Sequence, residues 1–197
     1  MTKTRIGTIN RNTAETQITL KLNIDGEGNS DIKTGIGFFD HMLTLFSKHG
    51  LFDLSVSVEG DLEVDGHHSV EDVGICLGLA FHDAIGDAFG INRYASAIVP
   101  MDESLCQIAI DVSNRPALGF NHNFDREKVG SFDSELVEEF FNAFVNNARV
   151  NLHIDMLKGS NLHHKIEACF KAFGICLDQA TQVDPRKKSV PSTKGIL

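Results

Sequence analysis

Apolar and polar residues alternate near the start of the chain with the two-residue period of a β-strand. Every second residue is apolar over 18–24, and the turn signal Asp25-Gly26-Glu27-Gly28 ends this pattern. A shorter strand is expected over 5–10. The next predicted elements are a helix over 37–49, a strand over 51–58 and a helix over 69–89. This part of the chain therefore combines both kinds of secondary structure.

The same order of patterns returns after residue 90. Its predicted elements are strands over 94–101 and 104–113, a turn at 114–116, a helix over 132–148, a strand over 149–157 and a helix over 162–180. The two parts also align directly, since residues 41–46 fall on 139–144 and residues 52–56 fall on 150–154 without a gap. Such self-similarity indicates an internal repeat.

Two histidine motifs give this repeat its strongest support. With two residues fewer in the next loop, His67-His68-x-x-Glu71 falls on His163-His164-x-x-Glu167. We therefore predict an α+β fold with an internal duplication of two similar half-domains, each a small sheet with two helices. The halves span 1–90 and 91–182, and a basic tail over 183–197 follows.

Composition and charge restrict the functions that this fold can have. The 197 residues carry a formal net charge of −9, which disfavours nonspecific binding to nucleic acid. The chain has no apolar run long enough to cross a membrane, and its polar start is unlike a secretory signal. Four cysteines without a C-x-x-C pair, Cys76, Cys106, Cys169 and Cys176, indicate reduced core thiols and a cytoplasmic protein.

The paired motifs indicate metal binding. Residues four apart share one face of a helix, so His67 with Glu71, and His163 with Glu167, can bind one ion each. The neighbouring residues His68 and His164 point about 100° away and are expected to serve a different ion. Imidazole with carboxylate suits zinc, iron or manganese, and spacing does not choose among them. Surface histidines that only decorate two helices are the alternative, which the duplication disfavours.

Other residues extend the candidate site. His41 lies in the first helix, and the repeat places Glu139 opposite it, so both are candidate ligands. Lys171, four residues past Glu167, adds an ammonium to the same face and suggests a substrate with an anionic tail. By themselves, such bases are more often solvated surface charges. Further phosphate-binding candidates are Arg93, Arg115, Ser192 and Lys194, whereas spacing gives His49 no partner.

Longer segments around these residues form a set that covers nearly the whole chain. The set comprises Ala14-Glu15-Thr16, residues 35–43, 65–72, 90–94 and 100–103, Asn114-Arg115-Pro116, and residues 161–168, 170–173 and 192–195. With both histidine motifs in this setting, the sequence resembles the imidazoleglycerol-phosphate dehydratase family of histidine biosynthesis. The resemblance implies a fold of the ribosomal S5 domain 2-like type. It also implies the loss of water from D-erythro-imidazoleglycerol phosphate to give imidazole acetol phosphate.

The resemblance further implies two manganese ions per active site and a shell of twenty-four subunits in which neighbouring chains complete each site. Its implied metal ligands are His41, His67, His68, Glu71, His163, His164 and Glu167. Many family members have histidine where this chain has Glu139, so that ligand is the one departure. The implied proton-transfer residue is Glu15, with Glu71 or Glu167 as a second carboxylate. The implied substrate and phosphate ligands are Glu15, His49, Arg93, Arg115, Lys171, Ser192 and Lys194.

Two other classes of protein share part of this pattern. A metal-dependent phosphatase of a small phosphorylated substrate would use the same histidines and bases but would release inorganic phosphate. A metal-storage protein would bind the ions without turnover and would need no phosphate ligands. The set of segments, which covers nearly the whole chain, favours the dehydratase. Such an enzyme acts on a small molecule and is expected to have no nucleic-acid or membrane partner.

Overall fold

Each half of the chain forms a four-stranded sheet and two helices in the same order. The computed structural model describes residues 4–122, 124 and 126–196, so the polar start at 1–3 lies outside the described residues. The first half comprises β1 (Ile6–Asn12), β2 (Thr16–Asn23), β3 (Ser30–Lys33), α1 (Gly37–Gly50), β4 (Asp53–Gly60) and α2 (His67–Ile85). The second half comprises β5 (Tyr94–Met101), β6 (Ser104–Asp111), β7 (Ala117–Asn121), α3 (Leu136–Ala148), β10 (Asn151–Lys158) and α4 (Leu162–Thr181).

The two sheets have the same topology and an equivalent register. Their strand orders are β1-β2-β4-β3 and β5-β6-β10-β7, and only the last pair of each sheet, β3 with β4 and β7 with β10, is parallel. Leu20 lies opposite Val56 in the first sheet, and Ile108 lies opposite Ile154 in the second. The predicted duplicated α+β architecture is therefore confirmed.

Some predicted boundaries were wrong. The parallel edge strands β3 and β7 were not predicted, because four or five residues are too few to establish a clear period. The helix expected over 132–148 begins at residue 136, since Phe132–Asp133 (β9) pairs with Lys128–Val129 (β8). The helix expected over 69–89 begins earlier, at His67, and ends at Ile85. The first motif therefore lies in the first turns of α2.

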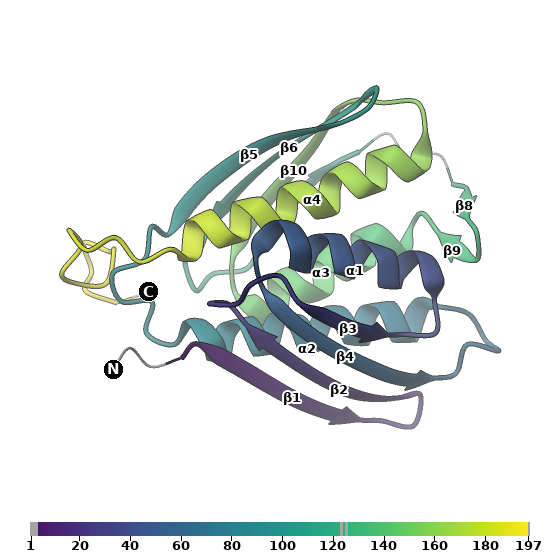
Figure 1. The fold of residues 1–197 in the computed structure, drawn as a ribbon, viewed down its shortest axis with the longest axis horizontal. Coiled ribbons are helices and arrows are strands. Elements are labelled where there is room, and N and C mark those ends of the chain that lie inside the picture. Colours follow the sequence, from purple (N-terminus) through teal and green to yellow (C-terminus); the bar gives the residue numbers. More distant parts are fainter. Residues whose placement is uncertain (1–3, 123, 125, 197) are drawn as a thin grey trace.

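The four helices lie between the two sheets, as Figure 1 shows. Helix α2 covers β1 and β2, and α4 covers β5 and β6. Each of these helices packs against a helix of the other half, α2 against α3 and α4 against α1. None of the described helices combines the length and apolar character needed to cross a bilayer. The core is consequently shared by both halves.

Glycines allow these helices to approach to backbone contact. A Cβ on Gly78 of α2 would lie 2.6 Å from the carbonyl oxygen of Phe144 in α3. A Cβ on Gly174 of α4 would lie 2.5 Å from the carbonyl oxygen of Phe46 in α1. Both distances are too short for a side chain, and the two glycines occupy equivalent positions in the repeat. Only glycine therefore permits this spacing.

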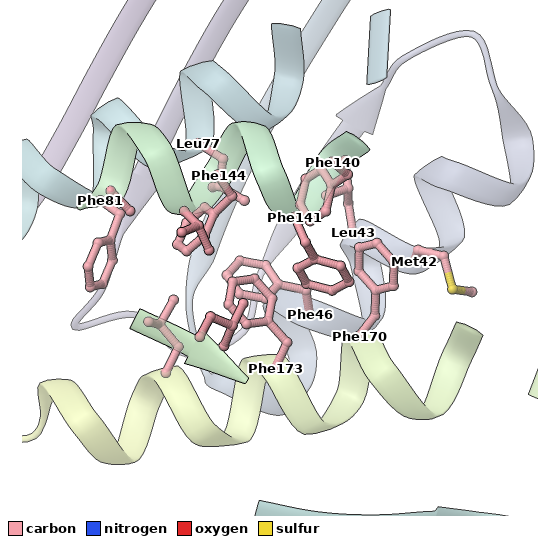
Figure 2. Close-up of a cluster of buried hydrophobic side chains, with 14 of the residues drawn as sticks. Met42, Leu43, Phe46, Leu77, Phe81, Phe140, Phe141, Phe144, Phe170 and Phe173 are labelled. Atoms are coloured by element: carbon pink, nitrogen blue, oxygen red, sulfur yellow. The ribbon is translucent and has the colours of Figure 1, made fainter. Parts of the chain in front are cut away.

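Phenylalanine side chains fill the space around the contacts. Figure 2 shows rings from α1, α3 and α4 converging between the helices. The ring of Phe173 lies 5.0 Å from Phe46 and 4.9 Å from Phe144, measured between centroids. All four cysteines are buried and unbridged, as their apolar surroundings predicted. Burial raises the pKa of the Cys76 thiol to about 11, which keeps it protonated.

Adding a methyl group at the α1–α4 contact should destabilise the fold. The variant Gly174→Ala should lower the free energy of unfolding by about 1–3 kcal/mol, because the added Cβ overpacks against backbone. Gly37→Ala is the matched control, since a Cβ at the start of α1 meets nothing within 4 Å. Urea unfolding of both variants measures the difference. Equal stability of the two variants would contradict the close packing of these helices.

Candidate metal centre

The packing of α1 against α4 brings His41 to the second histidine motif. Its Nε2 lies 3.3 Å from Oε2 of Glu167, and Nε2 of His163 lies 3.1 Å from the same oxygen. Within the described part of the chain, this is the one group of three histidine, cysteine or acidic residues whose ligand atoms all lie within 4.8 Å of one another. Two imidazoles and a carboxylate therefore converge from both halves of the fold.

The charges around Glu167 suit a cation. Its side chain is only 8% exposed, whereas those of His41 and His163 are 46% and 41% exposed. Burial by itself would raise the pKa of Glu167, but hydrogen bonds from Lys171, His41 and His163 outweigh burial and lower it. Lys171 Nζ lies 2.6 Å from Oε1, so Oε2 faces the imidazoles. Two nitrogens and one oxygen are a donor set that fits a divalent transition metal.

The first motif is arranged more loosely. Nε2 of His67 lies 4.0 Å from Oε2 of Glu71, and both side chains are nearly half exposed. Glu139 is partly buried on α3, the helix that packs against α2. The two motifs thus lie on equivalent helices, but among the described residues a third ligand atom joins a compact group only at the second motif.

The second histidine of each motif faces a different direction. The rings of His67 and His68 are inclined at 86°, and those of His163 and His164 at 80°. Nδ1 of His68 lies 3.0 Å from Asp61, and Nδ1 of His164 lies 2.7 Å from Glu103. These hydrogen bonds raise the pKa of both imidazoles. In each case Nε2 remains on the open side of the ring, next to another carboxylate: Glu15 beside His68 and Asp102 beside His164.

Glu15 is the carboxylate beside the open side of His68. Its Oε1 lies 3.8 Å from His68 Nε2, and its side chain is 55% exposed. The neighbouring Thr16 hydroxyl donates to the buried Asp72, which also pairs with Arg11. This network fixes the β1–β2 turn, and with it Glu15, to helix α2.

Sequence reasoning did not identify the residues that support these groups. Asp61, Asp72, Glu103 and Arg11 were not assigned any role. Asp72 had one usable signal, since it is an acid within the apolar stretch that follows Glu71. A lone acid after a strand, such as Asp61, has no pattern that distinguishes it from an ordinary loop residue.

Several of the candidate phosphate ligands gather at the other end of α4. Arg93 is buried, lies 2.7 Å from Asp111 through Nε, and donates from Nη1 to the carbonyl oxygen of Pro191. Arg115 is 61% exposed and lies 3.8 Å from the same aspartate. The contact at Pro191 holds the adjacent Ser192 near these arginines, and the amide of Lys194 donates to the Ser192 hydroxyl.

The two groups of candidate residues are far apart in one chain. The Arg93 amide donates to the carbonyl oxygen of Ala180, three turns or more beyond Glu167 on α4. At a rise of 1.5 Å per residue, this separation along the helix is about 20 Å. His49 and Lys171 instead lie on the metal side, where burial and the Lys171 charge lower the pKa of His49. The chain thus presents a candidate metal-binding end and a basic end.

Comparison with known proteins decides the family. The model of a family described as imidazoleglycerol-phosphate dehydratase matches residues 34–177, which include both histidine motifs. The chain belongs to the imidazoleglycerol-phosphate dehydratase family. Its relatives include the dehydratase of Pelobacter propionicus, 56% identical over 98% of this chain and 100% of that protein. The dehydratase of Acetivibrio thermocellus is 58% identical over 96% of this chain and 97% of that protein.

Solved dehydratase structures have the same fold. The enzyme of Staphylococcus aureus superposes with a TM-score of 0.83 at 43% identity, over 91% of this chain and 99% of that one. The enzyme of Pyrococcus furiosus, crystallised with (S)-C348, has a TM-score of 0.83 at 34% identity, over 96% and 100% of the two chains. This dehydratase is accordingly a hydro-lyase of histidine biosynthesis, and the expected family and fold are confirmed.

Removing the lysine beside Glu167 should shift the acid sensitivity of this dehydratase. The pKa of Glu167 is lowered, so its contribution to stability is fully present above the unfolded pKa, about 4.3, and is lost as pH falls through the folded value. Lys171→Met should raise that folded pKa, so the metal-free variant should lose stability at a higher pH than the parent protein. Urea unfolding across the acid range measures this shift.

The control for the loss of a positive charge is the substitution of an exposed lysine that contacts no carboxylate among the described side chains. Lys21→Met on β2 meets this need. Mn²⁺ should narrow the stability difference between Lys171→Met and the parent protein, because a bound cation would replace the missing ammonium beside Glu167. The same acid profile for Lys171→Met and Lys21→Met would contradict the role of the ion pair.

Proposed function

We propose that this chain catalyses the metal-dependent dehydration of D-erythro-imidazoleglycerol phosphate to imidazole acetol phosphate, with two Mn²⁺ ions per active site. The observation that supports metal dependence is the convergence of His41, His163 and Glu167, whose ligand atoms all lie within 4.8 Å of one another. An open arrangement of exposed imidazoles also suits a reaction centre, because a structural metal site is usually closed by protein ligands.

The proposed ligands fall into two sets. His41, His163 and Glu167 form the assembled set, and His67 with Glu71 forms the corresponding set of the other half, with Glu139 as its candidate third member. His68 and His164 present Nε2 in other directions and are proposed to bind ions held by other chains. When bound, the ions would supply Lewis-acid stabilisation of the substrate's imidazole ring.

Glu15 is proposed to transfer the proton in this reaction. The proton leaves a carbon without an adjacent carbonyl, the neighbouring hydroxyl leaves as water, and the resulting enol becomes the ketone. Glu15 is exposed and lies beside a histidine, and the Thr16–Asp72 contact holds its turn in place. Glu71 and Glu167 are the second candidates for this role.

The basic end is proposed to hold the phosphate. Arg93 and Arg115 supply guanidinium groups that match phosphate oxygens, and Ser192 and Lys194 add a hydroxyl and an ammonium. We propose that residues 183–197 form a distinct tail serving this purpose, after halves that span 1–90 and 91–182. On the metal side, His49 and Lys171 are proposed to contact the substrate.

The distance between the two ends supports a shared active site. A three-carbon chain joins the imidazole and the phosphate of the substrate, and it is far shorter than the roughly 20 Å that separates the two groups along α4. The phosphate ligands for one metal cluster would then come from a neighbouring chain. We propose a homo-oligomeric shell of twenty-four subunits, working in the cytoplasm without nucleic-acid or membrane partners.

A turnover assay tests this function. The purified protein is stripped of metal, reloaded with Mn²⁺ and given imidazoleglycerol phosphate, while ketone and inorganic phosphate are both measured. Metal-dependent formation of ketone without release of phosphate is expected. Release of phosphate would instead indicate a phosphatase, and metal binding without turnover would indicate a storage protein.

Substituting the proposed proton-transfer residue should stop turnover without emptying the metal sites. Glu15→Gln should lower kcat by about 10²–10⁴-fold, the usual contribution of general acid–base catalysis, because the amide does not accept the proton. Its Mn²⁺ content, measured by atomic absorption, should stay near that of the parent protein. Loss of Mn²⁺ from this variant would contradict a role limited to proton transfer.

Substituting a proposed phosphate ligand should weaken substrate binding. Arg115→Ala should raise KM more than it lowers kcat, because it removes an interaction made equally in the ground and transition states. Arg126→Ala is the matched control, since Arg126 is an exposed arginine outside the tail and outside both groups of candidate ligands. Steady-state kinetics of both variants provide the comparison, and an unchanged KM in Arg115→Ala would rule out this role.

A further inference from the structure

The duplication gives the two halves equivalent glutamates with different contacts. Glu15 directly precedes β2, and Glu103 directly precedes β6, the corresponding strand. Each reaches the second histidine of the motif in its own half. Glu103 accepts a hydrogen bond from Nδ1 of His164 at 2.7 Å, whereas Glu15 lies 3.8 Å from Nε2 of His68, on the opposite side of that ring. Equivalent carboxylates therefore occupy opposite sides of equivalent imidazoles.

Asp61 explains this difference. It directly follows β4 and accepts a hydrogen bond from Nδ1 of His68, with 3.0 and 3.2 Å to its two oxygens. Its backbone amide also donates to the carbonyl oxygen of Glu15, which joins the two loops. The position directly after β10 in the other half is Gly159, with a φ of +144° and a would-be Cβ 2.4 Å from the Ser104 hydroxyl. No carboxylate fits there, and Glu103 supplies one instead.

We propose that Asp61 and Glu103 are positioning residues that hold His68 and His164 with Nε2 directed outward as metal ligands. By orienting His68, Asp61 leaves Glu15 free for proton transfer. A histidine that donates Nδ1–H to a carboxylate has its lone pair on Nε2, the form that binds a metal. This inference rests on the proposed metal-dependent function and adds a division of roles between the two halves.

Both carboxylate oxygens of Glu103 accept hydrogen bonds that hold the side chain in this position. Oε2 accepts from His164, and Oε1 accepts from the backbone amides of Ser160 and Asn161 at 3.1 and 2.8 Å. These amides lie directly before α4, so Glu103 fixes the ring to the start of its helix. Such hydrogen bonds also hold the pKa of Glu103 well below its usual range. The side chain of Glu15 is exposed, and no backbone amide of the described residues anchors its carboxylate in this way.

Binding of Mn²⁺ alone to the assembled protein tests the proposal. Electron paramagnetic resonance of free Mn²⁺ measures the affinity. Asp61→Ala and Glu103→Ala should each bind Mn²⁺ about 10–100-fold more weakly, the usual effect of losing a carboxylate that orients a ligand histidine. Asp61→Asn should restore most of the affinity, because its side-chain oxygen accepts the same hydrogen. Asp31→Ala, which removes an exposed acid of β3, should bind like the parent protein.

Comparison of the two equivalent glutamates tests the division of roles. Glu15→Gln should keep the parent affinity for Mn²⁺ while losing kcat, whereas Glu103→Gln should lose affinity because an amide has one acceptor oxygen for two sets of donors. Parent-like Mn²⁺ affinity in both alanine variants would overturn the proposal, as would Asp61→Asn that binds no better than Asp61→Ala. A parent protein that binds Mn²⁺ without forming ketone would overturn the proposed function and leave the positioning role intact.

Discussion

The close contact between helices of different halves is the constraint on which the rest of the structure depends. Gly78 and Gly174 let the backbones of α2 and α3, and of α4 and α1, approach until a Cβ would not fit between them. The packed phenylalanines then fix the offset of these helices (Figure 2). His41 is thereby brought to His163 and Glu167, although a separation of more than 120 residues divides them in sequence. The cluster of candidate metal ligands is therefore a consequence of core packing.

The two halves share one arrangement of strands and helices, but the chemistry of the residues around their histidine motifs differs. The sheets keep the same order and register, and the histidine motifs begin equivalent helices. The differences lie in the residues around the motifs, such as His41 against Glu139 and Asp61 against Gly159. A protein with two unlike halves can assign different tasks to equivalent positions, as the contacts of Glu15 and Glu103 illustrate.

The sequence alone predicted what local pattern and repetition encode. Alternation at residues 18–24, the helical period of α1 and the doubled histidine motif led to the duplicated α+β fold. The pairing of His41 with the second motif was not predictable, because it depends on which helices cross between the halves. Asp61 and Glu103 were missed because a carboxylate that orients an imidazole has no sequence period. The separation of the basic end from the candidate metal-binding end likewise became visible only in the fold.

The central claim is that one chain does not contain a complete active site. It is tested most directly by co-expressing His163→Ala, which lacks a proposed metal ligand, with Arg115→Ala, which lacks a proposed phosphate ligand, and assaying mixed assemblies below the parent KM. If sites are shared between chains, some sites combine the intact His163 of one variant with the intact Arg115 of the other. Turnover of the mixed assemblies should then exceed the mean of the two variants assayed separately. Turnover equal to that mean would contradict the claim.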